Sequence, residues 1–276
     1  IRIAKQIVDI ANKVDAKFVI TTYEGYAWER LVYCFIRRMS PNIKCLGYQH
    51  AAVFKHQHAI KRELIKEFNP DVILTSGIVA KDILDKSQLK GGRVVCLGSP
   101  RYMEANTTTN SLQACLVVPT GVISEVLSLF ELSLECAIQN QDQKFIWRLH
   151  SLLSFEKLAK QSFIFRNLPG NITLSEDNLD NDIQKCNSVL YGGSTAVVSA
   201  INSGLRPIYY QRPADEVVAD PIYTCKIDKI IVQNQDELLK AIIQSHDKKD
   251  RKILQDFAQD FYTHLDVNVL LREIIR

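Results

Sequence analysis

Short apolar runs alternate along the chain with longer segments in which apolar residues recur every three or four positions. The short runs predict buried strands, and the longer segments predict amphipathic helices. Predicted strands occupy residues 17–22, 44–48, 71–75, 93–97, 114–118, 144–149, 171–174, 188–191, 206–210 and 226–232. Predicted helices occupy residues 1–11, 27–39, 60–67, 79–84, 123–138, 179–185, 196–203, 235–244, 249–262 and 267–275, and a further helix begins near residue 154. Strands that alternate with helices indicate an α/β fold of parallel sheets covered on both faces.

A polar stretch at residues 104–111 interrupts this alternation. It contains Asn-Thr-Thr-Thr-Asn at residues 106–110, which is typical of a linker. We therefore expect two Rossmann-like, doubly wound lobes, residues 1–110 and residues 111–276, the second ending in the carboxyl-terminal helices. In such folds the default site is the cleft between the lobes, at the carboxyl ends of the strands. Because the chain opens on Ile1 inside a helical pattern, we expect the amino-terminal lobe to be truncated.

The most informative stretch is residues 187–211, which predicts a strand, a tight turn, a helix and a second strand. Its turn is Gly-Gly-Ser-Thr at residues 192–195. The glycines tolerate positive φ and let backbone N–H groups such as that of Gly193 approach an anion, while Ser194 and Thr195 add hydroxyl donors. Ser194 is the predicted N-cap of the helix. The pattern fits a phosphate site, and it also fits a simple well-capped turn between strand and helix.

Composition narrows the class of protein. With 46% apolar and 24% charged residues among 276, the chain has the balance of a soluble globular protein. A formal net charge of +3 is too small to indicate a nucleic-acid partner. The seven cysteines form no Cys-x-x-Cys pair and are odd in number, which favours a reducing cytoplasm. No uncharged run is long enough to predict a membrane span.

Polar side chains with catalytic chemistry follow several predicted strands. Glu24 follows the strand at 17–22, His50 follows the strand at 44–48, and His150 follows the strand at 144–149. The carboxyl ends of parallel strands meet at one edge of a sheet, so we expect these groups and the glycine turn to face the site.

Four segments between residues 148 and 207 together resemble the donor-binding half of GT-B glycosyltransferases. The resemblance rests on Arg148-Leu-His150, the acidic segment at 175–177, the strand and turn at 186–195, and Gly-Leu-Arg-Pro at 204–207. Within that fold the chain is most similar to bacterial surface-carbohydrate enzymes, including Kdo transferases and sialyltransferases that use CMP-activated sugars. Residues 23–29 and 47–50 look like the acceptor-side segments of related enzymes.

The resemblance implies a role for each matched residue. His150 matches the histidine that binds the nucleotide, and Ser194 and Thr195 match the phosphate-binding turn. Ser151 stands where the family has a proline after that histidine, which bears on nucleotide specificity more than on fold. Arg148 either adds positive charge at the donor site or pairs with a carboxylate.

Inverting glycosyl transfer needs a base that takes the proton of the acceptor hydroxyl. Glu24 is the predicted base; the alternative is an acidic residue placed at a helix start by the helix dipole. His50 is a second predicted catalytic residue, with a structural hydrogen-bonded histidine as its alternative. His56 and His58 have no Cys or acidic partner at ligand spacing, so we predict neither a metal site nor a cofactor.

The sequence thus predicts an inverting, metal-independent glycosyltransferase. It would move a sugar from a nucleotide donor, such as a CMP-sugar, to a bacterial surface polysaccharide or lipopolysaccharide, with a glycan or lipid-linked glycan as acceptor. We expect a cytoplasmic protein, and the basic residues 37–38 and 248–252 are candidates for peripheral contact with the inner membrane. The alternatives are a UDP-sugar 2-epimerase-like enzyme and a non-catalytic binding protein that shares the fold.

Overall fold

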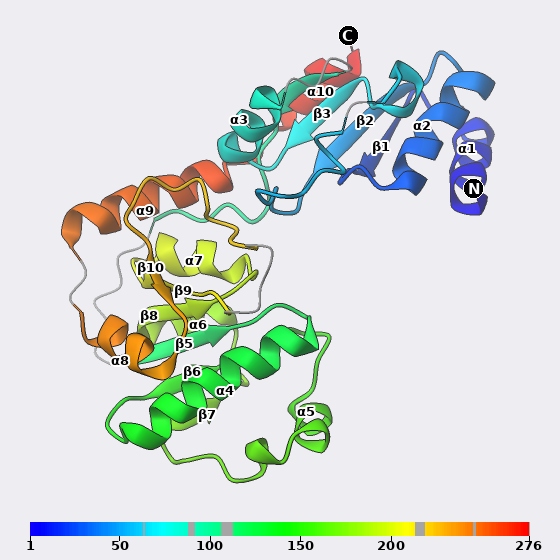
Figure 1. Cartoon of the computed structure of the whole chain (residues 1–276). Helices are drawn as coiled ribbons and strands as arrows, with labels where there is room; N and C mark the ends of the chain where they lie inside the picture. Colours follow the sequence, from blue (N-terminus) through cyan, green and yellow to red (C-terminus); the bar gives the residue numbers. More distant parts are fainter. Residues whose placement is uncertain (63, 88–91, 106–112, 213–218, 245–246, 276) are drawn as a thin grey trace. The chain divides into compact units, whose positions relative to one another are not determined.

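The computed structural model divides the chain into two compact units, which Figure 1 traces from amino to carboxyl terminus. It describes residues 1–62, 64–87, 92–105, 113–212, 219–244 and 247–275. Unit 1 contains Ile1–Val53, Gln57–Met103 and Gln259–Arg276. Unit 2 contains Phe54–His56 and Glu104–Ala258. The predicted linker at residues 106–110 lies outside the described residues.

Unit 1 is built on a parallel sheet with the strand order β1-β2-β3-β4. The strands are β1 (Phe18–Thr22), β2 (Lys44–Gln49), β3 (Val72–Thr75) and β4 (Arg93–Cys96). The helices are α1 (Arg2–Lys13), α2 (Ala27–Met39), α3 (Ile78–Lys86) and α10 (Val267–Ile275), with a short 3₁₀ turn η1 (Lys66–Phe68). All four residues of β3 are buried, as expected for a central strand covered on both faces.

The carboxyl-terminal helix belongs to unit 1, contrary to the prediction that residues 111–276 form one lobe. Leu270 and Ile274 of α10 pack on a cluster that includes Leu46 of β2 and Leu74 of β3. At the end of the same helix, the buried Glu273 forms an ion pair with Arg93. Burial of this apolar face keeps α10 on the first sheet, although almost the whole of unit 2 precedes it in the sequence.

Unit 2 is built on a six-stranded parallel sheet with the order β10-β9-β8-β5-β6-β7, which can be followed by its labels in Figure 1. The strands are β5 (Ala114–Val118), β6 (Phe145–Trp147), β7 (Ile172–Leu174), β8 (Cys186–Tyr191), β9 (Arg206–Tyr210) and β10 (Ile230–Val232). The first strand of unit 2, β5, is therefore central in this sheet, and the strand order reverses between β5 and β8. This is the doubly wound arrangement, and ligands of open α/β sheets bind at such a switch point.

Helices cover the sheet of unit 2. They are α4 (Ile123–Gln139), α5 (Phe155–Gln161), α6 (Leu179–Gln184), α7 (Ala196–Asn202) and α8 (Gln235–Ile243), with a 3₁₀ turn η2 (Phe163–Arg166). α9 (Lys248–Phe261) begins in unit 2 and ends in unit 1. Phe130 of α4 stacks on Trp147 of β6 with ring centroids 4.1 Å apart, and the indole N–H donates to Ser133 Oγ at 2.9 Å. These contacts fix α4 on the sheet beside the end of β5.

The structure confirms the predicted α/β fold with two parallel sheets, and the main difference in secondary structure lies at residues 60–67. A helix was predicted there, but η1 is the only helical turn among the described residues of this segment, which leave out residue 63. The guanidinium of Arg30 donates to the carbonyl oxygens of Ala59 at 2.7 Å and Arg62 at 2.9 Å. These carbonyls therefore accept from a buried side chain instead of from backbone N–H groups of a helix. None of the helices that the structure describes is both long and apolar enough to cross a bilayer.

Candidate functional site

Two turns meet at the switch point of unit 2. Residues 192–195 follow β8, and residues 119–122 follow β5. The strands pair in parallel, with Val118 opposite Tyr191, so the two turns leave the sheet side by side. This is the edge at which the sequence predicted an anion site.

Glu125, in the first turn of α4, connects these turns. Its Oε1 accepts from the N–H of Gly193 at 3.0 Å and from the N–H of Thr120 at 3.3 Å, and its Oε2 accepts from the Thr120 hydroxyl. A Cβ atom on Gly192 would lie 2.8 Å from Oε1, so a glycine lets the carboxylate approach the turn. In this structure the N–H of Gly193 in the turn therefore donates to the protein's own carboxylate.

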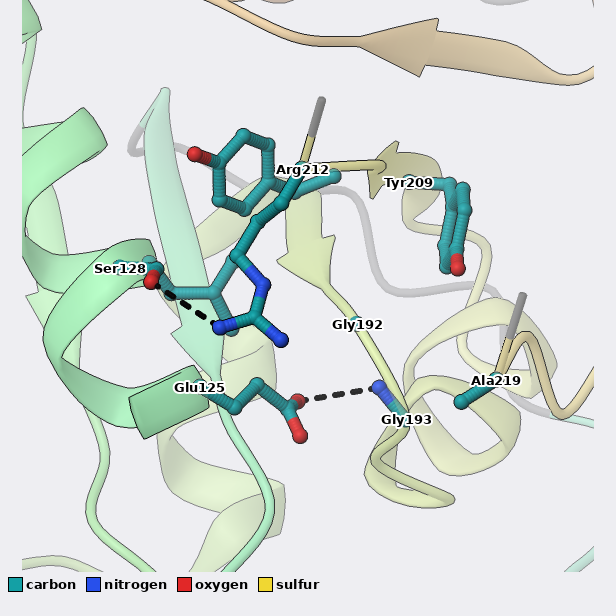
Figure 2. Close-up of a pocket in the computed structure, with 9 residues that line it drawn as sticks. Glu125, Ser128, Gly192, Gly193, Tyr209, Arg212 and Ala219 are labelled. Atoms are coloured by element: carbon teal, nitrogen blue, oxygen red, sulfur yellow. Dashed lines mark hydrogen bonds between the residues drawn. The ribbon is translucent and has the colours of Figure 1, made fainter. Parts of the chain in front are cut away.

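A small pocket of about 90 Å³ opens beside this carboxylate (Figure 2). Figure 2 shows the guanidinium of Arg212 pointing toward Glu125, and its Nη1 donates to Ser128 Oγ at 3.4 Å. Glycines 192 and 193, Tyr209 and Ala219 complete the labelled wall. Positive and negative side chains and backbone donors thus converge at the carboxyl ends of β8 and β9, which is the chemistry of a polar-ligand site.

The hydroxyl groups of Ser194 and Thr195 do not cap α7 in the way that the sequence predicted. The N-cap of α7 is Thr195, not Ser194, and Thr195 makes no side-chain capping hydrogen bond. Thr195 has φ and ψ of −71° and −6°, which lie in the right-handed helical region. Ser194 Oγ accepts only a long 3.4 Å bond from the N–H of Ala196. Both side chains are half-buried, so they can reorient toward a ligand.

His150 and Arg148 follow β6 but have different surroundings. His150 is exposed and lies against the turn after β5, since a Cβ on Gly121 would be 3.4 Å from its Nδ1. Arg148 donates to the carboxylate of Asp182 at 2.8 Å and to the carbonyl of Asp177 at 2.6 Å. The structure thus places His150 near the switch point and gives Arg148 the ion pair that was its alternative.

Asp182 belongs to Asp180-Asn181-Asp182, an Asp-x-Asp sequence in α6. Its side chain is only 2% exposed and is paired with Arg148, so its charge is already compensated. Within the described ranges, no three His, Cys, Asp or Glu side chains are grouped as metal ligands would be. The independence from metal that the sequence predicts stays a prediction.

In unit 1 the structure brings the two predicted catalytic residues together. Glu24 follows β1 and His50 follows β2, and these strands are paired neighbours. The imidazole Nε2 lies 3.8 Å from Glu24 Oε1, and the Tyr26 hydroxyl donates to Oε2 at 3.2 Å. The side chains of His50 and Glu24 are 40% and 21% exposed, respectively, so both can be reached from solvent. His50 Nδ1 is buried and has no partner among the described residues.

The turn that carries Glu24 is held by a second glutamate. Glu29 is 1% exposed, and its carboxylate accepts from the N–H groups of Glu24 at 3.0 Å and Tyr26 at 2.8 Å. Burial raises the pKa of Glu29, although these backbone donors oppose the shift. Gly25 has a φ of +83°, which only glycine adopts easily. The fixed turn holds the Glu24 backbone in place, so its carboxylate can stay beside His50.

Sequence reasoning missed Glu125, Ser128 and Arg212. An acidic residue in the first turn of the helix after β5 is a signal for Glu125, but helix starts favour acids in general. Ser128 and Arg212 carry no motif. Their proximity depends on the order of the strands, which the sequence pattern does not specify.

No family model and no curated protein matches this chain. Solved structures do match its fold. The glycosyltransferase of kitacinnamycin is 10% identical to this chain, with a TM-score of 0.65. The match covers 99% of this chain and 79% of the glycosyltransferase chain. A UDP-N-acetylglucosamine 2-epimerase from Listeria monocytogenes, described as putative, is 13% identical with a TM-score of 0.60, with 98% and 76% covered.

The GtfA/B complex is 12% identical with a TM-score of 0.62, over 98% of this chain. This chain spans only 60% of the length of that neighbour. These likenesses support the GT-B type of α/β fold with two parallel sheets. They do not confirm the finer resemblance to Kdo transferases and sialyltransferases.

Proposed function

We propose that the chain is a GT-B glycosyltransferase that uses a nucleotide-activated sugar. The observation that carries the proposal is the switch point of unit 2, where the glycine turn after β8, the turn after β5 and a polar pocket coincide. Nucleotides bind to open α/β sheets at this place. Fold neighbours named as a glycosyltransferase and as a UDP-sugar epimerase support a nucleotide-sugar ligand.

In this proposal the donor phosphate binds at the turn after β8. The N–H of Gly193 and the hydroxyls of Ser194 and Thr195 donate to it, and His150 approaches from the neighbouring turn. Arg148 holds the segment that contains Asp177, because its guanidinium donates to the backbone carbonyl of Asp177. Glu125 must give up the N–H of Gly193 when a phosphate binds there, because one N–H cannot serve two anions well.

For the chemical step we propose inversion without a metal. Glu24 takes the proton from the acceptor hydroxyl as that oxygen attacks the anomeric carbon, and the bond from this carbon to the nucleotide phosphate breaks. The leaving phosphate keeps the bonding electron pair, and the turn donors with protonated His150 stabilise its added charge. His50 lies close enough to Glu24 to hold or relay the proton. The proposed acceptor is a bacterial surface glycan or its lipid-linked precursor, with peripheral contact at the inner membrane.

A second candidate is a UDP-sugar 2-epimerase-like activity, which the fold neighbour from Listeria favours. Such an enzyme would bind the nucleotide at the same turn and would need no acceptor. A non-catalytic binding protein would also keep the nucleotide site. Product analysis separates the three: transfer to an acceptor, conversion of the UDP-sugar alone, or no turnover.

The donor site is tested by thermal unfolding with CMP, UDP, GDP and ADP at millimolar concentration. A ligand that binds only the folded chain raises its melting temperature. We expect one nucleotide to stabilise selectively and Ser194→Ala/Thr195→Ala to weaken that binding about tenfold, which corresponds to about 1.4 kcal/mol. Ser124→Ala, an exposed hydroxyl on α4, is the matched control.

Each outcome bears on the proposal. Selective binding of CMP favours a CMP-sugar, and selective binding of UDP or GDP keeps a glycosyltransferase with another donor. Loss of binding in the control as well would remove the turn from the site. No response to any nucleotide would overturn the donor site.

The base is tested with Glu24→Gln, once a donor and acceptor are in hand. We expect turnover to fall by about 100-fold or more, with nucleotide binding unchanged, because a general base contributes rate rather than donor affinity. Asp9→Asn, an exposed acid on α1, controls for charge. Unchanged turnover in Glu24→Gln would remove Glu24 from the mechanism.

A further inference from the structure

A second pocket lies at the opposite end of the unit 2 strands, away from the switch point. It has a volume of about 410 Å³. Its wall includes Asn187 near the start of β8, Arg206 at the start of β9, and Gln113 just before β5, together with Arg251 of α9. These are the amino ends of parallel strands, whereas the proposed donor site lies at their carboxyl ends.

Two arginines give this pocket a positive charge that no carboxylate of the described chain compensates by an ion pair. Arg206 is 5% exposed; its Nη2 donates to the carbonyl of Ile242 at 2.7 Å, but its Nε is buried without a partner among the residues the structure describes. The Nε of Arg251 is also buried and has no hydrogen-bond partner among the described residues. A buried charged donor without an acceptor is destabilising, so these atoms favour an acceptor supplied from outside the chain.

The position of Arg251 is fixed by the fold. A Cβ atom added to Gly204 would lie 3.4 Å from the Cδ of Arg251, so the Arg251 side chain packs against this glycine. Gly204 has a φ of +87°, which glycine adopts easily. The turn between α7 and β9 therefore forms the surface on which the Arg251 side chain lies. Two guanidinium groups held in this way resemble a built site more than a pair of mobile surface cations.

The pocket also offers an unpaired acceptor. Asn187 Oδ1 is buried and has no hydrogen-bond partner within the described ranges. A ligand that satisfies the wall must accept from two guanidinium groups and donate to one carbonyl oxygen. Hydrogen phosphate has both kinds of oxygen, whereas a fully ionised sulfate has no proton to donate.

We propose that this pocket binds a phosphate group. The ligand is either inorganic hydrogen phosphate, whose own hydroxyl donates to Asn187 Oδ1, or a phosphomonoester, in which a hydroxyl of the organic part donates instead. The volume of the pocket exceeds that of a phosphate group and leaves room for the organic part of a monoester. The site is distinct from the proposed donor site, and it would regulate or stabilise unit 2 from the other edge of the sheet.

The test is a titration of the whole chain with inorganic phosphate, glycerol 3-phosphate and sulfate, followed by thermal unfolding and calorimetry. If the dissociation constant is about 1 mM, 10 mM phosphate should raise the melting temperature by about 3–5 °C. Arg251→Gln should weaken binding about tenfold. Lys252→Gln removes one charge from the exposed face of the same helix and should leave the affinity unchanged.

The donor turn could also bind phosphate, so the Ser194→Ala/Thr195→Ala variant is titrated in parallel. We expect it to keep the phosphate response, and we expect Arg251→Gln to keep the nucleotide response. Tighter binding of glycerol 3-phosphate than of phosphate would identify a monoester, and the reverse would identify inorganic phosphate. Equal weakening by Arg251→Gln and Lys252→Gln, a response as large with sulfate, or no response in the unmodified chain would overturn the proposal.

Discussion

Glu29 and Glu125 occupy the same position in the two units and have different partners. Each is the third residue of the helix that follows the first strand of its sheet. Glu29 accepts from backbone N–H groups of its own turn and is almost fully buried. Glu125 accepts from its own turn and also from Gly193, in the turn after β8.

The strand order explains the difference. In the described part of unit 1, β1 is an edge strand with one neighbour, so Glu29 has no second turn within reach on that side. In unit 2, β5 is central and has β8 beside it at the switch point. The same helix-start glutamate therefore closes one turn in unit 1 and joins two turns in unit 2. An acid at this position becomes a candidate for function when its strand is central.

The largest expected effect is on stability in unit 1. Glu29→Ala removes a buried carboxylate that accepts from the partly buried N–H groups of Glu24 and Tyr26, and we expect a loss of about 3 kcal/mol in the free energy of unfolding. Denaturant unfolding followed by fluorescence measures it. The exposed Asp9→Ala should change stability by less than about 0.5 kcal/mol. If the two variants lose the same amount, Glu29 does not hold its turn.

A smaller effect on stability, with a gain in binding, is expected in unit 2. Glu125 is only partly buried, so water can replace its oxygens in Glu125→Ala, and we expect a loss of about 1 kcal/mol. The freed N–H of Gly193 should bind the donor phosphate about tenfold more tightly, as calorimetry with the preferred nucleotide would show.

Glu131→Ala, an exposed acid of the same helix, controls for the change in net charge. Weaker nucleotide binding in Glu125→Ala than in this control would contradict the view that the carboxylate competes with phosphate. It would instead make Glu125 a direct ligand of the nucleotide.

The smallest expected effect is a pH dependence that only Glu29 should show. Its pKa in the folded chain lies above the usual 4.5, so just above pH 4.5 the folded state holds a proton that the unfolded state has lost. The stability of the unmodified chain relative to Glu29→Gln should therefore fall as pH rises from 4.5 through the folded pKa, and stay constant above it. Unfolding curves at several pH values measure this difference. A relative stability that rises with pH would show that the N–H donors outweigh burial.

Most of the fold follows from local sequence pattern. The helix at 27–39 and the strands at 114–118 and 206–210 have the predicted bounds, because the helix buries one face and the strands are short apolar runs that are buried almost throughout. Residues 60–67 depart from prediction, and the carbonyl of Arg62 in this segment accepts from Arg30, about thirty residues earlier. A local pattern contains no information about such a contact.

The site was predictable where it depends on the ends of successive strands. Glu24 and His50 follow β1 and β2, which are neighbours in sequence and in the sheet, so they lie together. The bond between Glu125 and Gly193 spans 68 residues and exists only because β8 returns to the side of β5. Its prediction requires the strand order, and alternating strands and helices are compatible with several orders.

The place of α10 in unit 1 has a consequence for biosynthesis. The strands of unit 1 leave the ribosome well before α10, so Leu46 and Leu74 lack the apolar cover of this helix until residues 267–275 have been made. Domains usually fold in the order in which they are synthesised. Here almost all of unit 2 is translated between the strands of unit 1 and the helix that covers them, so this apolar face stays open to aggregation while unit 2 is made.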